Sequence, residues 1–373
     1  MRRYRIGVFG WKTSPVDGGS DTILRTLNEK ILETPSRGRF EIVPVPWQDW
    51  DRRRSPWYLR HKIARYFGSV LPPVDLRPVC RRLRLDLAYF ATPSFVQIDL
   101  PFIFSLWDVG HRVCPEFPEL RRGEWEHLEA LCRRMLAQAS FVVVGNHAGA
   151  AEACELFGLK AGRVIALPFP NPDFSSIAEI VPPWMPPRPF FFYPAQGWPH
   201  KNHDALLQAL AFLSNAGHTL PDLVFAGSDK GNFAHLKSVA EALRISERVH
   251  FAGFVPRGEI KALYRRAVAL VFPSMLGPNN LPPQEAAVLG CPVVLSDLPG
   301  HREQLGDGAL YVPPLDARAW GEAMLKLMTN TEYRLALAVR AKDVVAGYTA
   351  DAYVSRLTEL FSSLVAMRAL WGD

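Results

Sequence analysis

The chain has 373 residues, of which 48% are hydrophobic and 21% charged, a composition typical of a globular protein and a length typical of about two domains. No run of about 18 apolar residues occurs, which excludes a helical membrane span, and the short apolar run after the start is no signal peptide. The five cysteines are scattered without a CxxC pair, so we expect free thiols and a cytoplasmic protein.

The net charge of +6 is concentrated in one stretch. Residues 51–86 hold ten arginine or lysine side chains against three aspartates, with tryptophan and tyrosine between them. This pattern is typical of a solvated basic face, and it also fits an anionic membrane surface or a phosphate-bearing acceptor. No nucleic-acid-binding motif accompanies the charge, so we expect no nucleic-acid partner. Peripheral contact with the inner membrane through 51–86 is a hypothesis.

In the first half of the chain, short apolar runs alternate with segments of helical periodicity. The expected strands are 4–10, 85–91, 101–107, 140–146 and 163–168, and the expected helices are 20–33, 123–138 and 148–157. Residues 181–189, VPPWMPPRP, contain five prolines, which excludes a helix or a central strand and indicates a linker.

After the linker the alternation starts again. The expected strands are 189–194, 222–228, 248–254, 268–274, 291–297 and 309–313, with helices at 202–215, 232–243, 257–266, 282–289, 316–328 and 331–345. Continuous apolar strands separated by helices predict parallel sheets covered on both faces. We therefore expect an α/β protein with two Rossmann-like, doubly wound domains at 1–180 and 190–347. A last helix within 348–373 could return to the first domain.

Polar residues follow two strands of the second half, and both segments favour an anion. In SMLGPNNLPPQEAAVLG, Pro282 and Pro283 are suited to a first helical turn, whose free amides and dipole attract negative charge. Gly277 permits close backbone approach, and Asn279 and Asn280 add donors next to Leu281. Glu285 is expected in the first turn of a helix at 282–289, where a carboxylate is favoured and can accept from ligand hydroxyls.

The second segment, YPAQGWPHKNHDALL, places Gln196, His200 and Lys201 before a helix. A cation at a helix start opposes the dipole, so a bound phosphate is a better explanation for Lys201 than chance exposure. Two anion sites in one domain favour a diphosphate.

Three further segments carry weaker signals. Asp229 and Lys230 lie in a GSDKGN turn after a strand and could contact a base or ribose, although the same residues are common in turns. Gly18 and Gly19 could approach a phosphate. His111, in SLWDVGHR, follows a strand of the first domain, where a lone histidine is structural or functional. The chain contains no G-x-G-x-x-G, Walker A or metal-ligand spacing, so we expect neither a metal nor a cofactor.

Together, LWDVGHRVCPEFPE, PAQGWPHKNHDALLQAL, GSDKGN and LVFPSMLGPNNLPPQEAAVLGCPVVLSDLPGHREQLGDGALYVPP resemble a bacterial family-4 retaining glycosyltransferase, in the mannosyltransferase-like branch that builds O-antigen and polysaccharide chains. The resemblance covers about 85–345. It implies the GT-B fold, in which two domains face a cleft, the second domain holds a nucleotide sugar and the first an acceptor. It also implies metal-independent transfer, in which the leaving phosphate takes the acceptor proton.

By this resemblance, Lys201 would bind the donor diphosphate and Glu285 the donor ribose. Three family positions differ here: the first glutamate of the Glu-(seven residues)-Glu motif falls at Gly277, an arginine at Ala195 and a histidine at Trp107. Amides after Gly277, His200 and His111 are the candidate replacements, so His111, Lys201 and Glu285 are the expected catalytic residues.

The expected reaction is the transfer of a hexose to a saccharide or lipid-linked acceptor in cell-surface polysaccharide synthesis. Mannose from GDP-mannose is the first expectation for the donor. A UDP-hexose donor and a weakly active nucleotide-sugar-binding module remain alternatives. A two-domain epimerase would need a carboxylate and histidine arrangement that we do not find.

Overall fold

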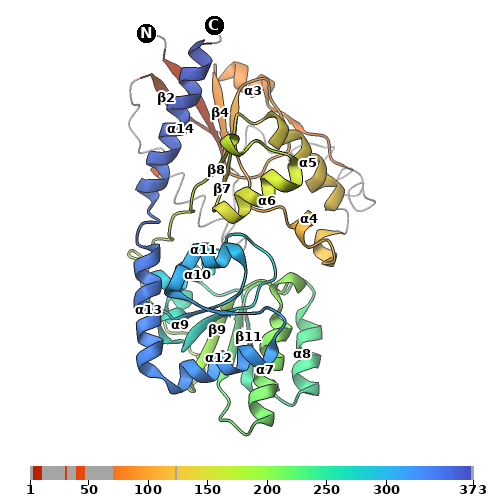
Figure 1. Ribbon diagram of the computed structural model, residues 1–373, viewed down its shortest axis with the longest axis vertical. Coiled ribbons are helices and arrows are strands. Elements are labelled where there is room, and N and C mark those ends of the chain that lie inside the picture. Colours follow the sequence, from red (N-terminus) through yellow and green to blue (C-terminus); the bar gives the residue numbers. More distant parts are fainter. Residues whose placement is uncertain (1–2, 11–29, 32–38, 47–69, 122–123, 371–373) are drawn as a thin grey trace. The chain divides into compact units, whose positions relative to one another are not determined.

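A computed structural model describes residues 3–10, 30–31, 39–46, 70–121 and 124–370 in two compact units (Figure 1). Unit 1 consists of Met1–Pro170 and Tyr348–Asp373, and unit 2 of Asn171–Gly347. The basic segment 51–69 and most of the expected helix at 20–33 lie outside the described residues. Within the described part, no helix has both the length and the apolar character that a bilayer span requires.

The described strands of unit 1 form a parallel sheet in the order β2-β1-β4-β6-β7-β8, with a separate parallel pair β3-β5. The strands are β1 (Tyr4–Phe9), β2 (Phe40–Val45), β3 (Val74–Asp75), β4 (Leu87–Phe90), β5 (Val96–Gln97), β6 (Phe102–Ser105), β7 (Phe141–Val144) and β8 (Val164–Ala166). The helices are α3 (Arg77–Arg82), α4 (Gly110–Val113), α5 (Trp125–Gln138), α6 (His147–Phe157), α14 (Ala350–Leu370) and the 3₁₀ turns η4 (Pro118–Leu120) and η5 (Ala161–Arg163).

Strand β2 was not expected from the sequence, because its FEIVPV carries a proline and little hydrophobic alternation. It lies at an edge of the sheet, where Pro44 breaks no central ladder. Helix α14 covers this end of unit 1, beside β2 and β4 in Figure 1. Its Phe361 ring lies 5.9 Å from the ring of Phe40 and 5.9 Å from that of Tyr89. The last helix is therefore part of the core of unit 1.

Unit 2 holds a second parallel sheet, in the order β11-β10-β9-β12-β13-β14. Its strands are β9 (Phe190–Pro194), β10 (Asp222–Ala226), β11 (Val249–Gly253), β12 (Ala269–Phe272), β13 (Val293–Ser296) and β14 (Leu310–Val312). Its helices are α7 (His203–Asn215), α8 (Phe233–Ala242), α9 (Arg257–Arg266), α10 (Leu281–Val288), α11 (Pro299–Leu305), α12 (Ala317–Thr329), α13 (Thr331–Val345) and the 3₁₀ turns η6 (Pro199–Lys201), η7 (Ser246–Arg248) and η8 (Gly306–Gly308).

The strand order of unit 2 reverses between β9 and β12, as in a doubly wound Rossmann sheet. The two strands are buried at every apolar position because helices cover both faces of the sheet. At the centre, the Tyr193 ring lies 5.3 Å from that of Phe272 and 6.2 Å from that of Phe225. In doubly wound sheets, ligands bind beyond the carboxyl ends of the strands at such a reversal.

The boundary between the units falls near residue 170 rather than near 180. Residues 171–180 pack on α9 of unit 2, where Lys261 Nζ donates to the carbonyl oxygens of Phe174 (2.8 Å) and Ile177 (2.7 Å). The Ile180 amide also donates to Gly258 O at 3.1 Å. These contacts lie ahead of the proline-rich segment 181–189, which has no helix or strand of its own.

Candidate functional site

Two loops predicted separately from the sequence meet at the switch point of unit 2. One follows β9 and carries Lys201, and the other follows β12 and carries Asn280. Lys201 Nζ lies 3.1 Å from Asn280 Oδ1 and 3.4 Å from Ser274 Oγ. The carboxyl ends of neighbouring parallel strands share one edge of a sheet, which is why residues about 80 positions apart in sequence come together here.

The backbone around Lys201 is fixed by hydrogen bonds from three directions. Tyr193 Oη donates to Lys201 O at 2.6 Å, and the Met275 amide donates to His200 O at 2.9 Å. Asn202 has φ 55° and donates through Nδ2 to Pro314 O at 2.7 Å. Its left-handed conformation ends η6 and starts α7, so the half-buried Lys201 is presented from a rigid turn.

Helix α10 begins at Leu281, with the two prolines in its first turn as the sequence predicts. Pro282 and Pro283 have no N–H group, so the Leu281 amide is the donor that this turn can offer. Gly277 has φ 119°, and a Cβ at this position would lie 2.5 Å from Asn280 Nδ2. Only glycine therefore allows the loop to fold back on itself before the helix. Asn279 is half-buried in the same loop.

Glu285 lies on the second turn of α10 and faces α9. Tyr264 Oη donates to Glu285 Oε2 at 2.9 Å. Burial raises the pKa of Glu285 above its ordinary value, and the bond from Tyr264 opposes that rise. Within the described residues, the other carboxylate oxygen has no hydrogen-bond partner. A carboxylate held in this way can accept from a ligand hydroxyl.

The loops after β9 and β10 lie against each other. The Gly197 amide donates to Ser228 O at 2.9 Å, and a Cβ on Gly197 would come within 2.3 Å of Asp229 O. Gln196 Oε1 accepts from Trp198 Nε1 at 2.8 Å. Glycine is therefore required for the close contact, which carries Gln196 to the same sheet edge as Lys201.

Asp229 and Lys230 occupy positions typical of turn residues. Asp229 Oδ1 accepts from the Phe233 amide at 2.6 Å and so supports the start of α8. Lys230 has φ 54°, and its Nζ lies 5.2 Å from the centre of the Trp198 ring. The exposed Asp229 thus has a structural task, while contact with a base or ribose stays a prediction for both residues.

His111 is buried inside unit 1 and is held by a carboxylate. Its side chain is 2% exposed, and its Nε2 lies 3.2 Å from Glu129 Oε2. Burial lowers the pKa of His111, whereas the guanidinium of Arg112 holds the pKa of Glu129 at about 2. Arg133 Nε also donates to Glu129. These contacts give the His111 ring structural partners, while the polar role near a donor sugar stays a prediction.

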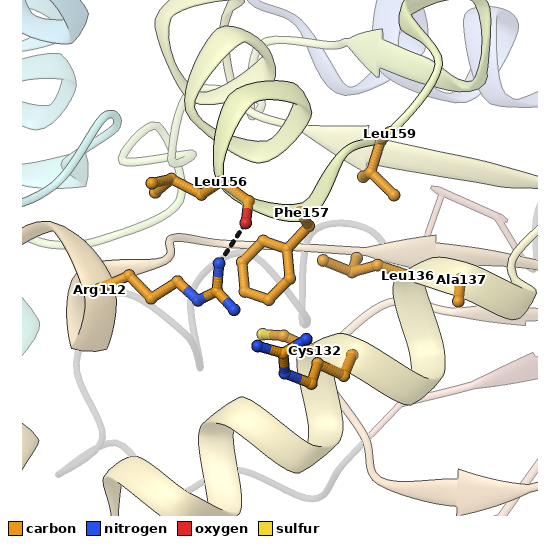
Figure 2. A pocket seen from close by; sticks show the side chains of 8 residues that line it. Arg112, Cys132, Leu136, Ala137, Leu156, Phe157 and Leu159 are labelled. Atoms are coloured by element: carbon orange, nitrogen blue, oxygen red, sulfur yellow. Dashed lines mark hydrogen bonds between the residues drawn. The ribbon is translucent and has the colours of Figure 1, made fainter.

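A pocket of about 280 Å³ lies beside this cluster, between α5 and the end of α6. Figure 2 shows Arg112 reaching the Leu156 carbonyl beside the Phe157 ring, and its guanidinium carbon lies 4.0 Å from the centre of that ring. Arg112 is thereby committed to Glu129, Leu156 and Phe157, so the pocket belongs to the packing around His111. Gly18 and Gly19 lie outside the described residues.

Sequence reasoning missed two residues of the site, His301 and Gln304. Both lie on α11, a helix that was not expected because it has only seven residues and begins with proline and glycine. His301 is fully buried and its Nε2 lies 3.0 Å from Asn280 Nδ2. Gln304 Nε2 donates to Asn280 O at 2.6 Å. Their position after strand β13, at the same sheet edge, is the signal that could have found them.

The described residues contain no group of three or more histidine, cysteine, aspartate or glutamate side chains that could hold a metal ion. Metal-independence remains a prediction. The loop before α10 and the helix itself offer Lys201 as a neighbour, the Leu281 amide and the Glu285 carboxylate, which suits a ligand with an anionic and a hydroxyl-bearing part.

Two solved structures resemble the whole chain. The sucrose-phosphate synthase from Thermosynechococcus elongatus superposes with a TM-score of 0.71 at 17% identity, covering 98% of this chain and 100% of that one. Anabaena HepE in complex with UDP-glucose superposes with a TM-score of 0.68 at 17% identity, covering 96% and 99%. The fold is thus the GT-B fold of glycosyltransferases, with two Rossmann-like parallel sheets.

The match to a family model lies within unit 2. Residues 181–344 match the family described as glycosyl transferases group 1. The O-antigen chain mannosyltransferase RfbU of Salmonella typhimurium is 32% identical over 162 residues, 43% of this chain and 44% of the relative. A D-inositol 3-phosphate glycosyltransferase of Corynebacterium urealyticum is 30% identical over 174 residues, 45% and 41%. The aligned part of the chain spans less than half the length of these two relatives.

Proposed function

We propose that this chain transfers a hexose from a nucleotide-sugar donor to a hydroxyl of a saccharide or lipid-linked acceptor, with retained configuration, in cell-surface polysaccharide synthesis. The observation that carries the proposal is the meeting of Lys201 with the loop before α10 at the switch point of a group 1 domain. GDP-mannose is the donor that we propose first, because an O-antigen chain mannosyltransferase is among the relatives.

The chemistry follows from the charge that develops when the donor leaves. The bond from the sugar C1 to the diphosphate breaks, a bond to the acceptor oxygen forms, and the acceptor proton passes to a phosphate oxygen. Lys201 Nζ and the Leu281 amide at the start of α10 would stabilise the additional negative charge on the diphosphate. Glu285, whose Oε1 is available, would accept from the donor ribose hydroxyls.

The first experiment is a thermal-shift panel with GDP, UDP, ADP and their sugars. A ligand at a hundredfold excess over its Kd stabilises the folded state by about 2.7 kcal/mol. We expect a shift with GDP species that is lost in Lys201→Ala and kept in Lys342→Ala, an exposed lysine on α13. No shift with any nucleotide would contradict the proposal, and formation of mannosylated product from GDP-mannose would complete it.

A UDP-hexose donor is the second candidate. The similar structure of Anabaena HepE contains UDP-glucose, although a sequence identity of 17% supports similarity of the fold and not of the ligand. A shift selective for UDP in the same panel would keep the site and the reaction class and replace mannose as the donor.

A weakly active binding module is the third candidate, because Gly277, Ala195 and Trp107 replace residues of the wider family. It predicts nucleotide binding without turnover when donor and a range of acceptors are supplied together. Product formation at a rate abolished by Lys201→Ala would exclude it.

Peripheral membrane contact is a separate proposal that rests on the basic stretch. In its described part, Arg81, Arg82 and Arg84 are exposed at the end of α3 and after it. Replacing all three by glutamine should weaken binding to vesicles that contain phosphatidylserine, since each basic residue near an anionic surface contributes about 1 kcal/mol. Unchanged vesicle binding would contradict the membrane role of this segment.

A further inference from the structure

A continuous line of hydrogen bonds runs from Lys201 into the interior of unit 2. Asn280 Oδ1 accepts from Lys201 Nζ at 3.1 Å, and Asn280 Nδ2 lies 3.0 Å from His301 Nε2. His301 Nδ1 lies 2.9 Å from the carbonyl oxygen of Ser296, at the end of β13. The line thus links the cation of the site to the backbone of a central strand through one amide and one imidazole.

The direction of each bond is determined by the carbonyl at its inner end. A carbonyl oxygen can only accept, so the proton of His301 is on Nδ1. Burial lowers the pKa of His301 to about 4, so near neutral pH the ring is uncharged and Nε2 holds a lone pair. Nε2 therefore accepts from Asn280 Nδ2, and this contact orients the amide so that Oδ1 faces Lys201.

Helix α11 holds the backbone of Asn280 as well as its side chain. Gln304, one turn after His301, donates to Asn280 O at 2.6 Å and is 3% exposed. At the start of the same helix, a Cβ on Gly300 would lie 2.2 Å from Pro278 O, so the loop and the helix are in direct backbone contact. Asn280 makes no side-chain cap to α10, and its amide instead contacts Lys201, His301 and the carbonyl oxygen of Gly277, which accepts from Nδ2 at 3.3 Å.

We propose that His301 is a positioning residue of the donor site. It acts through Asn280, whose oriented amide holds the ammonium of Lys201 where a nucleoside diphosphate binds. His301 touches no ligand in this scheme, and its task is to reduce the freedom of a flexible side chain before the ligand arrives. This inference rests on the proposed function, since it assumes that Lys201 binds a diphosphate.

The test is a double-mutant cycle on the binding of GDP and UDP, measured by isothermal titration, with guanosine and uridine as probes without phosphate. His301→Leu fills the buried position with an apolar side chain and removes the acceptor, whereas His301→Gln retains an acceptor. We expect His301→Leu to weaken diphosphate binding about tenfold, the effect of losing a bond of about 1.4 kcal/mol. His301→Gln should recover part of the affinity, and binding of the nucleosides should not change.

The decisive comparison is made in the Lys201→Ala background. If His301 acts through Lys201, then His301→Leu should cause no further loss of diphosphate affinity once the lysine is absent. Asn280→Ala should behave in the same way, and it provides the test if His301→Leu fails to fold, because Asn280 is only half-buried. An equal fold-change in both backgrounds, or unchanged affinity in a folded His301→Leu protein, would overturn the inference.

The matched control is His250→Leu. His250 Nε2 lies 3.1 Å from Asp222 Oδ2 at the amino end of β10, on the opposite edge of the same sheet. This variant should lower the unfolding midpoint and leave diphosphate affinity unchanged. If the wild-type protein binds neither GDP nor UDP, the proposed function fails and the inference with it. If Lys201→Ala weakens the binding of GDP or UDP, the proposed diphosphate site stands. The double-mutant cycle then decides only whether His301 acts through Lys201.

Discussion

The hydroxyl group of Tyr264 donates a hydrogen bond to the carboxylate of Glu285. The raised pKa of Glu285 means that the folded protein favours its protonated form more than the unfolded chain does. Its contribution to the free energy of unfolding is therefore most favourable in acid and is lost as the pH rises through the folded pKa. Tyr264 counteracts this loss by donating to the charged form.

Tyr264→Phe should reduce the free energy of unfolding by about 1.5–3 kcal/mol at neutral pH, since a hydrogen bond to a charged group is lost. The loss should shrink towards acid pH, where the carboxyl is protonated and needs no donor. Urea unfolding of both proteins between pH 4 and 8 measures the difference.

The control is Tyr311→Phe. Tyr311 Oη donates to the backbone oxygen of Gly306 at 2.7 Å. Because a backbone carbonyl does not titrate, losing this hydrogen bond should reduce the free energy of unfolding by the same amount across the pH range. If the loss of unfolding free energy in Tyr264→Phe is also independent of pH, the prediction is wrong. The Tyr264 hydroxyl would then stabilise the fold only by donating to the Pro282 carbonyl oxygen, 3.3 Å away.

At the scale of single residues, the sequence indicates which residues are candidates for the site better than it indicates which of them contact one another. Lys201, Asn280 and Glu285 were identifiable because each lies in a loop after a strand or in the first two turns of the helix that follows it. The bond between Lys201 and Asn280 depends on strand order, which no local pattern encodes. His111 also follows a strand, but its side chain contacts Glu129, which lies eighteen residues later on α5. His301 looked like an ordinary helix residue because its partner is distant in sequence.

At the scale of elements, the site depends on close backbone contacts between loops and short helices. Gly197 brings the loops after β9 and β10 together, and Gly300 brings α11 against the loop before α10. Apolar runs predicted the buried strands of unit 2 to within a few residues, because those strands are buried on both faces. Edge strand β2 and seven-residue α11 lack such runs and were missed.

Gly300→Ala should disturb the loop that carries Asn280. The added methyl group would need the space of Pro278 O, so the free energy of unfolding should fall by about 1–3 kcal/mol and GDP or UDP binding should weaken. Gly162→Ala in η5 is the matched control, since a Cβ there meets nothing within 4 Å. Equal stability and affinity in the two variants would contradict this packing argument.

At the scale of the whole molecule, unit 2 is a continuous segment inserted between two parts of unit 1. The second part is essential to the first: Tyr353 and Phe361 of α14 are each 1% exposed, and Tyr353 Oη lies 3.2 Å from Tyr89 Oη. A helical pattern after residue 350 was visible in the sequence, but its packing partner was not.

Phe361→Ala should destabilise unit 1 by about 3–5 kcal/mol, because the lost ring leaves a cavity against Phe40 and Tyr89. Leu370→Ala, in the same helix at 85% exposure, should have almost no effect. Chemical denaturation of both variants measures the difference, and a similar small loss in each would mean that α14 adds little to this core.

The insertion also sets an order of events during synthesis. The sheet of unit 1 leaves the ribosome well before α14, with all of unit 2 translated in between. At about 5–20 residues per second, the roughly 200 residues after Pro170 take about 10–40 s to appear. During that time the aromatic surface formed by Phe40 and Tyr89 lacks the cover of α14, while unit 2 is still being synthesised. Nascent chains stalled before residue 350 should therefore be the ones that recruit chaperones.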